Sequence, residues 1–254
     1  MNGLDLFSGI GGIGLALEPW VRTVAYCERD RYAQGVLLSR MQSGDIDRAP
    51  IWDDVTSLRG DMLPRIDIIF GGFPCQDISV AGLGKGLDGK RSGLFFEIAR
   101  LIQECKPSFV FLENVPAIRT RGGERAVKEL AALGYDCRWT TLSAAAVGAP
   151  HKRERWFLLA YSKREGLQRG LPIRPNEERE SQFRHVGRGR SGIPAGRPTQ
   201  SGFASSKDFW SIEPAVGRVA NGIRDRSHRI ICLGNSVVPL QVREAFKKLA
   251  GINL

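Results

Sequence analysis

The sequence has no apolar run that approaches the roughly 20 residues a helix needs to cross a bilayer. It also lacks the pattern of a signal peptide, because a glycine-rich loop already follows Ser8. These two absences predict a protein of the cytoplasm that has no membrane partner. The five cysteines form no C-x-x-C pair, and none of the three histidines stands at metal-ligand spacing. We therefore expect neither a metal site nor a disulfide framework.

Acidic side chains are too few to balance the basic ones. The chain has 27 Asp and Glu against 37 Lys and Arg, which gives a formal net charge of +10. Such an excess favours a polyanionic partner such as nucleic acid, although many basic proteins bind none. With 254 residues, 42% of them hydrophobic, the chain is long enough for one substantial core and a minor second lobe.

Short apolar runs alternate with segments of helical periodicity from residue 1 to about residue 160. Strands are predicted over 3–7, 21–27, 65–70, 108–113, 137–145 and 155–161. Helices are predicted over 30–41, 93–105 and 123–134, and a last helix begins near Val238 and carries Val242, Ala245, Phe246 and Leu249. This alternation predicts an α/β fold, in which helices cover both faces of a mostly parallel sheet. Ligands of such sheets bind at the carboxyl ends of the strands.

Composition divides the chain into three parts. Residues 1–161 form the predicted α/β domain, and residues 228–254 form a C-terminal segment that returns to it. Between them, residues 162–227 are rich in Arg, Gly, Ser and Pro and have few large apolar side chains. Such a composition cannot build a large core, so we expect a small irregular lobe there, with a solvated linker as the alternative.

A glycine pattern near the N-terminus indicates a nucleotide-type ligand. Gly9, Gly11 and Gly14 match G-x-G-x-x-G, and Glu28 lies just after the next apolar run. Glycines allow the backbone to turn sharply and approach a ligand, and an acidic residue at this place suits a ribose diol. The same geometry serves any adenosine-containing ligand, so a nicotinamide-dependent enzyme is one interpretation of this pattern alone.

A cysteine and a glutamate follow neighbouring strands of the predicted sheet. Cys75 lies in a turn with Gly71, Gly72 and Pro74, and Glu113 ends the apolar run "FVFLE". A thiol in such a turn can act as a nucleophile, although a lone cysteine near a sheet is more often a small buried apolar group. Together the two residues place a nucleophile and a potential acid on one rim.

Taken in order, eight segments resemble the motifs of the DNA cytosine-5 methyltransferases over about four fifths of the chain. They are "DLFSGIGG", "YCERDRYAQ", "DDVTSL", "GGFPCQDIS", "GLFFEIARLI", "FLENV", "GAPHKRERWFLLA" and "LGNSVVP". The resemblance implies a Rossmann-like sheet that binds S-adenosylmethionine and methylates carbon 5 of a cytosine flipped out of double-stranded DNA. It also implies that residues 162–227 are a target-recognition lobe, and we expect a bacterial or phage-encoded monomer with a possible separate restriction nuclease as its partner.

The resemblance assigns roles to residues that match the motifs. Those assigned to catalysis are Cys75, which adds to carbon 6 of the cytosine, with Glu113, Arg153 and Arg155. Those assigned to the cofactor are Phe7, Gly9, Gly11, Glu28, Arg29, Asp54, Val55, Leu94, Asn235 and Ser236. Ser79, Lys85 and Arg91, in the glycine-rich segment 79–93 that matches the loop closing over DNA, are assigned to DNA binding.

The segment assigned to target recognition departs from the family pattern. It is short and poor in apolar residues, and short lobes of this kind also occur in relatives that modify transfer RNA. Against an RNA substrate, Pro-Cys-Gln is followed here by Asp-Ile-Ser and the chain lacks the Cys-Phe-Thr signature of that branch. RNA cytosine-5 methylation and a catalytically silent DNA-binding protein stay open as alternatives.

Overall fold

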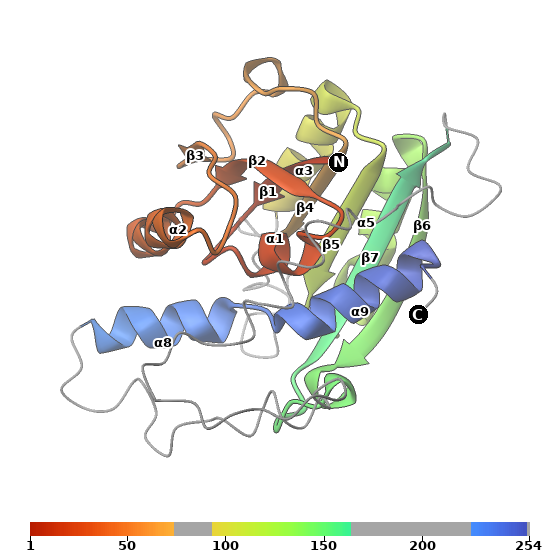
Figure 1. Ribbon diagram of the computed structural model, residues 1–254. Helices are drawn as coiled ribbons and strands as arrows, with labels where there is room; N and C mark the ends of the chain where they lie inside the picture. The colour runs from red at the N-terminus through yellow and green to blue at the C-terminus, as the bar shows by residue number, and fades with distance from the viewer. Residues whose placement is uncertain (74–92, 164–224, 253–254) are drawn as a thin grey trace, which may run out of the picture.

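The computed structural model describes residues 1–73, 93–163 and 225–252 (Figure 1). In this described part, one seven-stranded sheet has the strand order β3-β2-β1-β4-β5-β7-β6. The strands are β1 (Asn2–Leu6), β2 (Arg22–Cys27), β3 (Ile51–Trp52), β4 (Ile68–Gly72), β5 (Phe109–Asn114), β6 (Tyr135–Ser143) and β7 (Glu154–Ser162). β1 to β5 run parallel, and β7 is antiparallel to both of its neighbours. The predicted mostly parallel α/β sheet is therefore confirmed.

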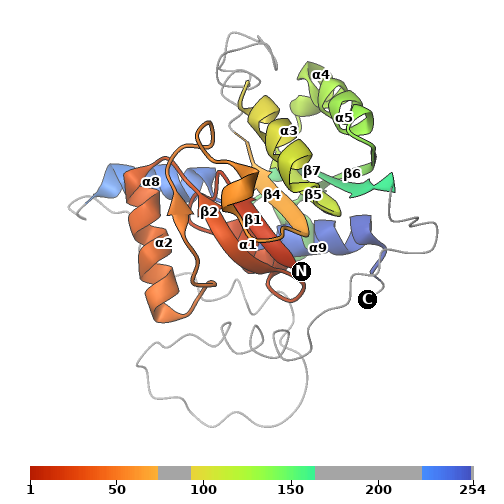
Figure 2. The same ribbon diagram turned by 90° about the horizontal axis from the view of Figure 1, so that it is seen from above.

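Helices lie on both faces of the sheet, as Figure 2 shows from above. They are α1 (Gly12–Leu17), α2 (Arg31–Ser43), α3 (Leu94–Cys105), α4 (Ile118–Arg121), α5 (Gly123–Ala132), α8 (Arg226–Asn235) and α9 (Pro239–Ala250). Two short 3₁₀ turns cover Gly60–Met62 and Ala144–Val147.

Alternating side chains along the central strands divide the interior into two cores. On β5, Phe109 and Phe111 pack with α1 and α9, whereas Val110 and Leu112 pack on the opposite face with α3 and α5. Period-two alternation of fully apolar residues is what a strand covered on both faces requires. Phe111 meets Phe246 of α9 edge to face, with ring centroids 5.3 Å apart, so the last helix seals one core.

Four of the described helices and strands were not predicted from the sequence. β3 is only two residues and α4 only four residues long, α1 lies within the glycine pattern, and α8 exposes most of its side chains. The last helix begins at Pro239, directly after Val238, and all four apolar residues predicted for it are buried. The predicted strand 137–145 begins two residues earlier, and its last two residues lie in a 3₁₀ turn.

The described ranges contain no helix long and apolar enough to span a bilayer. Most of the predicted lobe, residues 164–224, lies outside the described residues, so the division into parts stays a prediction. The C-terminal helix α9 packs against α1, and the Arg243 guanidinium donates a hydrogen bond to the Ala16 carbonyl at 3.1 Å.

Gly71 lies where β4 approaches β1 most closely. A Cβ at this position would lie 2.1 Å from the carbonyl oxygen of Leu6 and 3.0 Å from its carbonyl carbon. The obstructing atoms belong to a buried strand and cannot move aside, unlike the end of a flexible side chain. The pairing of β1 with β4 therefore requires glycine.

Gly71→Ala should lower the free energy of unfolding by about 3 kcal/mol, because the added methyl group overlaps backbone atoms of β1. This corresponds to a fall of the melting temperature on the order of 5–10 °C, which circular dichroism can follow. Gly35→Ala is the matched control, because nothing lies within 4 Å of a Cβ at this exposed position of α2. It should leave stability unchanged or raise it by up to about 1 kcal/mol. Equal melting temperatures for Gly71→Ala and the unmodified protein would contradict the interpretation.

Candidate active site

The residues singled out from the sequence gather at one edge of the sheet. Because β1 to β5 are parallel, their carboxyl ends share this edge, and the strand order reverses between β1 and β4. A crevice forms at such a reversal, since the connections from the two strands leave in opposite directions. The glycine loop leaves β1 at this point and the segment that leads to Cys75 leaves β4. We call this edge the rim.

The loop after β1 turns on three residues with left-handed backbone. Phe7, Gly9 and Gly11 have φ values of 54°, 53° and 79°. This conformation suits glycine but costs a residue with a Cβ about 1–3 kcal/mol, so Phe7 is held under strain. The Ser8 N–H donates to the Cys27 carbonyl at 3.1 Å and fastens the loop to β2. Nothing lies within 4 Å of a Cβ built on Gly9, which leaves its outer side open to a ligand.

Glu28 connects this loop to the start of α2. Its carboxylate accepts hydrogen bonds from the backbone N–H of Gly9 at 2.6 Å and of Asp30 at 2.7 Å. Asp30 in turn caps α2 by accepting from the Ala33 N–H at 2.8 Å. A carboxylate offers about four acceptor sites, so the fixed Glu28 can accept further hydrogen bonds from a diol.

The other residues assigned to the cofactor lie around the same side of the rim. Asp54 accepts from the Thr56 N–H at 2.9 Å and hydroxyl at 2.8 Å, and these bonds, with the charge of the exposed Arg29, lower its pKa. Val55 is buried, and the Val55 carbonyl accepts from Arg100 at 2.9 Å. Leu94, the first residue of α3, packs partly buried against the core that contains Val55, as Phe7 does.

Glu113 is a buried carboxylate at the end of β5. It forms an ion pair with Arg155 of β7, with 2.9 Å between Oε1 and Nε. Burial raises the pKa of Glu113 to about 7, although the charges of Arg155 and Arg153 oppose this. Glu113 therefore exchanges its proton near neutral pH, which suits a group that donates or shares a proton with a substrate.

Gly72 makes room for this carboxylate. It pairs with Glu113 in the register of β4 and β5, and a Cβ at Gly72 would lie 2.7 Å from Oε2 of Glu113. The two consecutive glycines therefore leave space for different groups. Gly71 leaves space for the backbone of β1, and Gly72 leaves space for the Glu113 side chain. The sequence reasoning placed both residues in a turn and did not identify the space at Gly72.

Arg153 bonds to the C-terminal segment. Its guanidinium donates to the carbonyls of Gly234, at 2.9 Å, and Ser236. The buried Gln241 of α9 donates to the Arg153 carbonyl at 2.8 Å and holds Arg153 in a left-handed conformation with φ 25°. Its hydrogen bonds tie the residue before β7 to the α8–α9 junction, where Ser236 and the exposed Asn235 lie. The expected place of Arg153 beside the nucleophile stays a prediction, because Cys75 lies outside the described residues.

Asn114 and Gln241 are two site residues that the sequence reasoning missed. Asn114 is buried at the end of β5, and its amide donates to the Phe73 carbonyl at 3.3 Å. This bond fixes the backbone two residues before Cys75. The signal for Asn114 was its place in the "FLENV" segment, whereas Gln241 was visible only as one polar residue in an apolar helix face.

Four predicted residues lie outside the described residues, namely Cys75, Ser79, Lys85 and Arg91. Within the described ranges, no group of three or more His, Cys, Asp or Glu residues could hold a metal ion. Among the described residues, the rim brings together Glu113, Arg155 and the glycine loop. Arg153 lies close enough for its charge to act on Glu113 and also bonds to the C-terminal junction.

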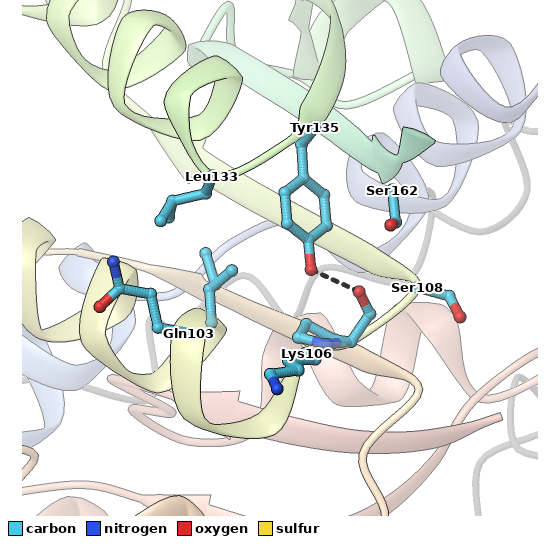
Figure 3. A pocket seen from close by; sticks show the side chains of 8 residues that line it. Gln103, Lys106, Ser108, Leu133, Tyr135 and Ser162 are labelled. Carbon is cyan, nitrogen blue, oxygen red and sulfur yellow. Dashed lines mark hydrogen bonds between the residues drawn. The ribbon is translucent and has the colours of Figure 1, made fainter. Parts of the chain in front are cut away.

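A cavity of about 240 Å³ lies at the other end of β5, away from the rim (Figure 3). Lys106 and Ser108 line it just before β5, with Tyr135 at the start of β6 and Ser162 at the end of β7. The Tyr135 hydroxyl donates to the Pro107 carbonyl at 2.5 Å. This cavity is too far along the strands to belong to the site at the rim.

Comparison with known proteins shows which family the chain resembles. A family model described as C-5 cytosine-specific DNA methylase matches residues 1–213. The chain is 34% identical over 248 residues to the Type II methyltransferase M.CviJI of Paramecium bursaria Chlorella virus IL3A, covering 97% of this chain and 58% of that protein. It is 35% identical over 170 residues to the Type II methyltransferase M.HhaI of Haemophilus parahaemolyticus, covering 65% and 50%. The chain thus spans about half the length of these curated relatives.

Solved structures share the fold. A putative DNA modification methyltransferase encoded within an E. coli prophage has a TM-score of 0.56 at 26% identity, covering 69% of this chain and 52% of that one. The Entamoeba histolytica methyltransferase EhMeth has a TM-score of 0.64 over 98% of this chain and 97% of its own, and at 14% identity it shows the fold alone. The predicted Rossmann-like methyltransferase sheet is confirmed.

Glu113→Gln should remove a pH dependence of stability. Because the folded pKa of Glu113 is raised from 4.5 to about 7, the folded state binds the extra proton between these pH values. The free energy of unfolding of the unmodified protein should therefore fall by up to about 3 kcal/mol, relative to that of Glu113→Gln, as the pH rises from 4.5 through 7. Above pH 8 the difference between the two proteins should change no further.

Urea unfolding of both proteins at a series of pH values measures this difference. The control is Glu124→Gln, which changes an exposed glutamate of α5 that pairs with Lys128 and lies outside the rim. It should not reproduce the change between pH 4.5 and 7. A stability difference between the Glu113→Gln variant and the unmodified protein that stays constant with pH would show that Glu113 is ionised throughout.

Proposed function

The chain belongs to the C-5 cytosine-specific DNA methylase family, and on this premise we propose that it is a DNA cytosine-5 methyltransferase. Its substrate is double-stranded DNA, and its methyl donor is S-adenosylmethionine. The observation that carries the proposal is the buried Glu113, whose pKa is about 7 and which Arg155 orients at the rim, beside the strand that leads to Cys75.

The described residues fit the proposed cofactor. Gly9 leaves open space beside the loop, and the Glu28 carboxylate is fixed with acceptor capacity left for a ribose diol. The strained Phe7, the buried Val55 and the partly buried Leu94 supply apolar surface around the same part of the rim. When bound, S-adenosylmethionine supplies an electrophilic methyl group. Asn235 and Ser236 close this side from the C-terminal segment.

The protein side chains make the cytosine reactive. Carbon 5 is a weak nucleophile until the Cys75 thiolate adds to carbon 6, which forms an S–C bond and moves electron density to carbon 5. Glu113 holds a proton against ring nitrogen 3 and offsets the negative charge that develops on the ring. Arg155 holds the cytosine's exocyclic oxygen as well as the carboxylate. After methyl transfer, carbon 5 loses its proton to a water molecule that acts as the base, and the S–C bond to Cys75 breaks.

The target base must leave the DNA stack, because carbon 6 is inaccessible inside a duplex. Ser79, Lys85 and Arg91 contact the DNA in this proposal, and the short segment 162–227 recognises the target sequence. The net charge of +10 supports such a polyanionic partner. We further propose that the protein acts as a monomer within the cell, with a separate cognate restriction nuclease as a possible partner.

Cys75→Ser should abolish methyl transfer, because a hydroxyl is far less ionised than a thiol and adds poorly to carbon 6. Duplex DNA is incubated with methyl-labelled S-adenosylmethionine, and label on 5-methylcytosine is measured. Cys137→Ser is the matched control, since Cys137 lies on β6 outside the rim, and it should retain activity. Bisulfite sequencing of plasmid from expressing cells should return the target sequence. Label on adenine, or on RNA alone, would overturn the proposal.

A covalent trap separates a working enzyme from a silent DNA-binding relative. DNA with 5-fluorocytosine at the target cannot lose the carbon 5 substituent, so the S–C bond to Cys75 persists after methyl transfer. We expect a denaturation-resistant adduct that depends on S-adenosylmethionine and is absent for Cys75→Ser. DNA binding without an adduct would support the silent relative.

Glu28→Gln should weaken the binding of S-adenosylmethionine by about tenfold, because a charged acceptor for the ribose diol becomes neutral. Calorimetric titration measures this, with NAD as the competing candidate ligand, for which we expect no binding. Asp61→Asn, at an exposed position paired with Arg59, is the control and should bind as the unmodified protein does. Tight binding of NAD alone would favour the nicotinamide-dependent interpretation.

A further inference from the structure

Helix α8 crosses the cofactor side of the rim and is fastened at both ends. At its C-terminal end, Arg153 donates hydrogen bonds to the carbonyls of Gly234 and Ser236. Near its N-terminal end, the His228 imidazole stacks on the Tyr32 ring of α2, with ring centroids 5.1 Å apart and an angle of 21° between the planes. Figures 1 and 2 both show α8 beside α2.

The middle of α8 faces the loop that holds Glu28. His228, Cys232 and Asn235 are spaced i, i+4 and i+7, so they share one face of the helix. Burial raises the pKa of the Cys232 thiol, and the nearby carboxylates of Asp30 and Glu28 raise it further. This face of α8 therefore lies against the start of α2, where Glu28 and Asp30 are fixed.

The junction after α8 lies over the glycine loop. A Cβ built on Gly12 would lie 2.9 Å from Cγ2 of Val237, so this junction packs directly on the start of α1. α8 thus spans the distance from the glycine loop to α2. Asn235 and Ser236, which carry the proposed contacts to the cofactor, lie at one end of this span and the ring stack lies near the other.

Among the described residues, the contacts of the N-terminal half of α8 include the stack of His228 on Tyr32. Most side chains of α8 are exposed, including Ile230. In the described part of the chain, the stack on Tyr32 is the aromatic contact that ties this half of α8 to the body of the protein.

We propose that Tyr32 and His228 are positioning residues that hold α8 across the cofactor side of the rim and thereby slow the release of S-adenosylmethionine. The proposal rests on the proposed function, because it assumes that this methyl donor binds beneath Asn235. Neither residue takes part in the chemistry. Their ring contact keeps α8 in the orientation in which Asn235 and Ser236 face the glycine loop.

Tyr32→Leu and His228→Leu test the proposal, with Tyr32→Phe and His228→Phe as conservative counterparts that keep a ring. Stacked aromatic pairs contribute enough to change an equilibrium constant by about twofold to tenfold. We expect each Leu variant to raise the Kd of S-adenosylmethionine by this factor, mainly through faster dissociation. The kcat at saturating cofactor and the melting temperature should stay unchanged. The Phe variants should bind S-adenosylmethionine with the Kd of the unmodified protein. The double Leu variant should have the same Kd as either single Leu variant, because each of them already removes the one ring contact.

The reactivity of Cys232 gives a second readout that needs no catalysis. Iodoacetamide labelling, mapped by mass spectrometry to each cysteine, should be slowed at Cys232 by S-adenosylmethionine in the unmodified protein. The Leu variants should label faster at Cys232 than the Phe variants, both with and without cofactor. This comparison also reports on α8 if a Leu variant loses stability, because the unfolded fraction would expose Cys27 equally.

The outcomes separate this proposal from the proposed function. If the unmodified protein does not bind S-adenosylmethionine, the proposed function fails. If it binds, and the Leu variants match it in Kd, dissociation rate and Cys232 labelling, the positioning role of Tyr32 and His228 is overturned. The role would also be overturned if the Phe variants lost as much affinity for S-adenosylmethionine as the Leu variants, since the ring contact would then not be the cause.

Discussion

The rim depends on the absence of side chains at two consecutive positions of β4. Gly71 lets the Leu6 carbonyl approach, so β1 and β4 pair where the strand order reverses, and Gly72 leaves space for the Glu113 carboxylate. Neither space can be supplied by a flexible neighbour, because one is bounded by buried backbone and the other by an ion-paired carboxylate. The pairing of β1 with β4 at the rim and the position of its acid are therefore consequences of one dipeptide that carries no functional group of its own.

Burial raises the pKa of Glu113 and the neighbouring arginine charges lower it, and the balance of the two sets its protonation near neutral pH. A carboxylate that faced only Arg155 would stay ionised at neutral pH, and one that was only buried would stay protonated. Here burial prevails, with a pKa of about 7, and the 2.9 Å ion pair fixes the direction of the carboxyl group. Asn114, the next residue, fastens the strand that leads to Cys75. Position and protonation are thus controlled from one strand end.

The sequence predicts those parts of the fold that depend on local patterns. Apolar runs locate β1, β2, β4, β5, β6 and β7, and parallel strands bring Gly9, Glu28 and Glu113 to one edge without further information. It does not predict α8, whose large apolar residues Ile230, Ile231 and Leu233 are themselves exposed. Nor does it predict the partners of Arg153, which lie more than 80 residues away and are backbone carbonyls that any residue could supply. The ion pair of Arg155 with Glu113 was likewise not predicted, because it depends on how β7 pairs with β5.

The hydrogen bonds of Arg153 and Gln241 have a consequence for the order of folding. Both join the turn between β6 and β7 to residues near the end of the chain, across separations of 81 to 99 residues, and Arg243 reaches back 227 residues to Ala16. Contacts of such long range form late, because the loops they close are entropically costly. During synthesis the sheet can therefore assemble while the cofactor side of the rim is still open, and a nascent chain acquires its complete binding surface only after α9 has left the ribosome.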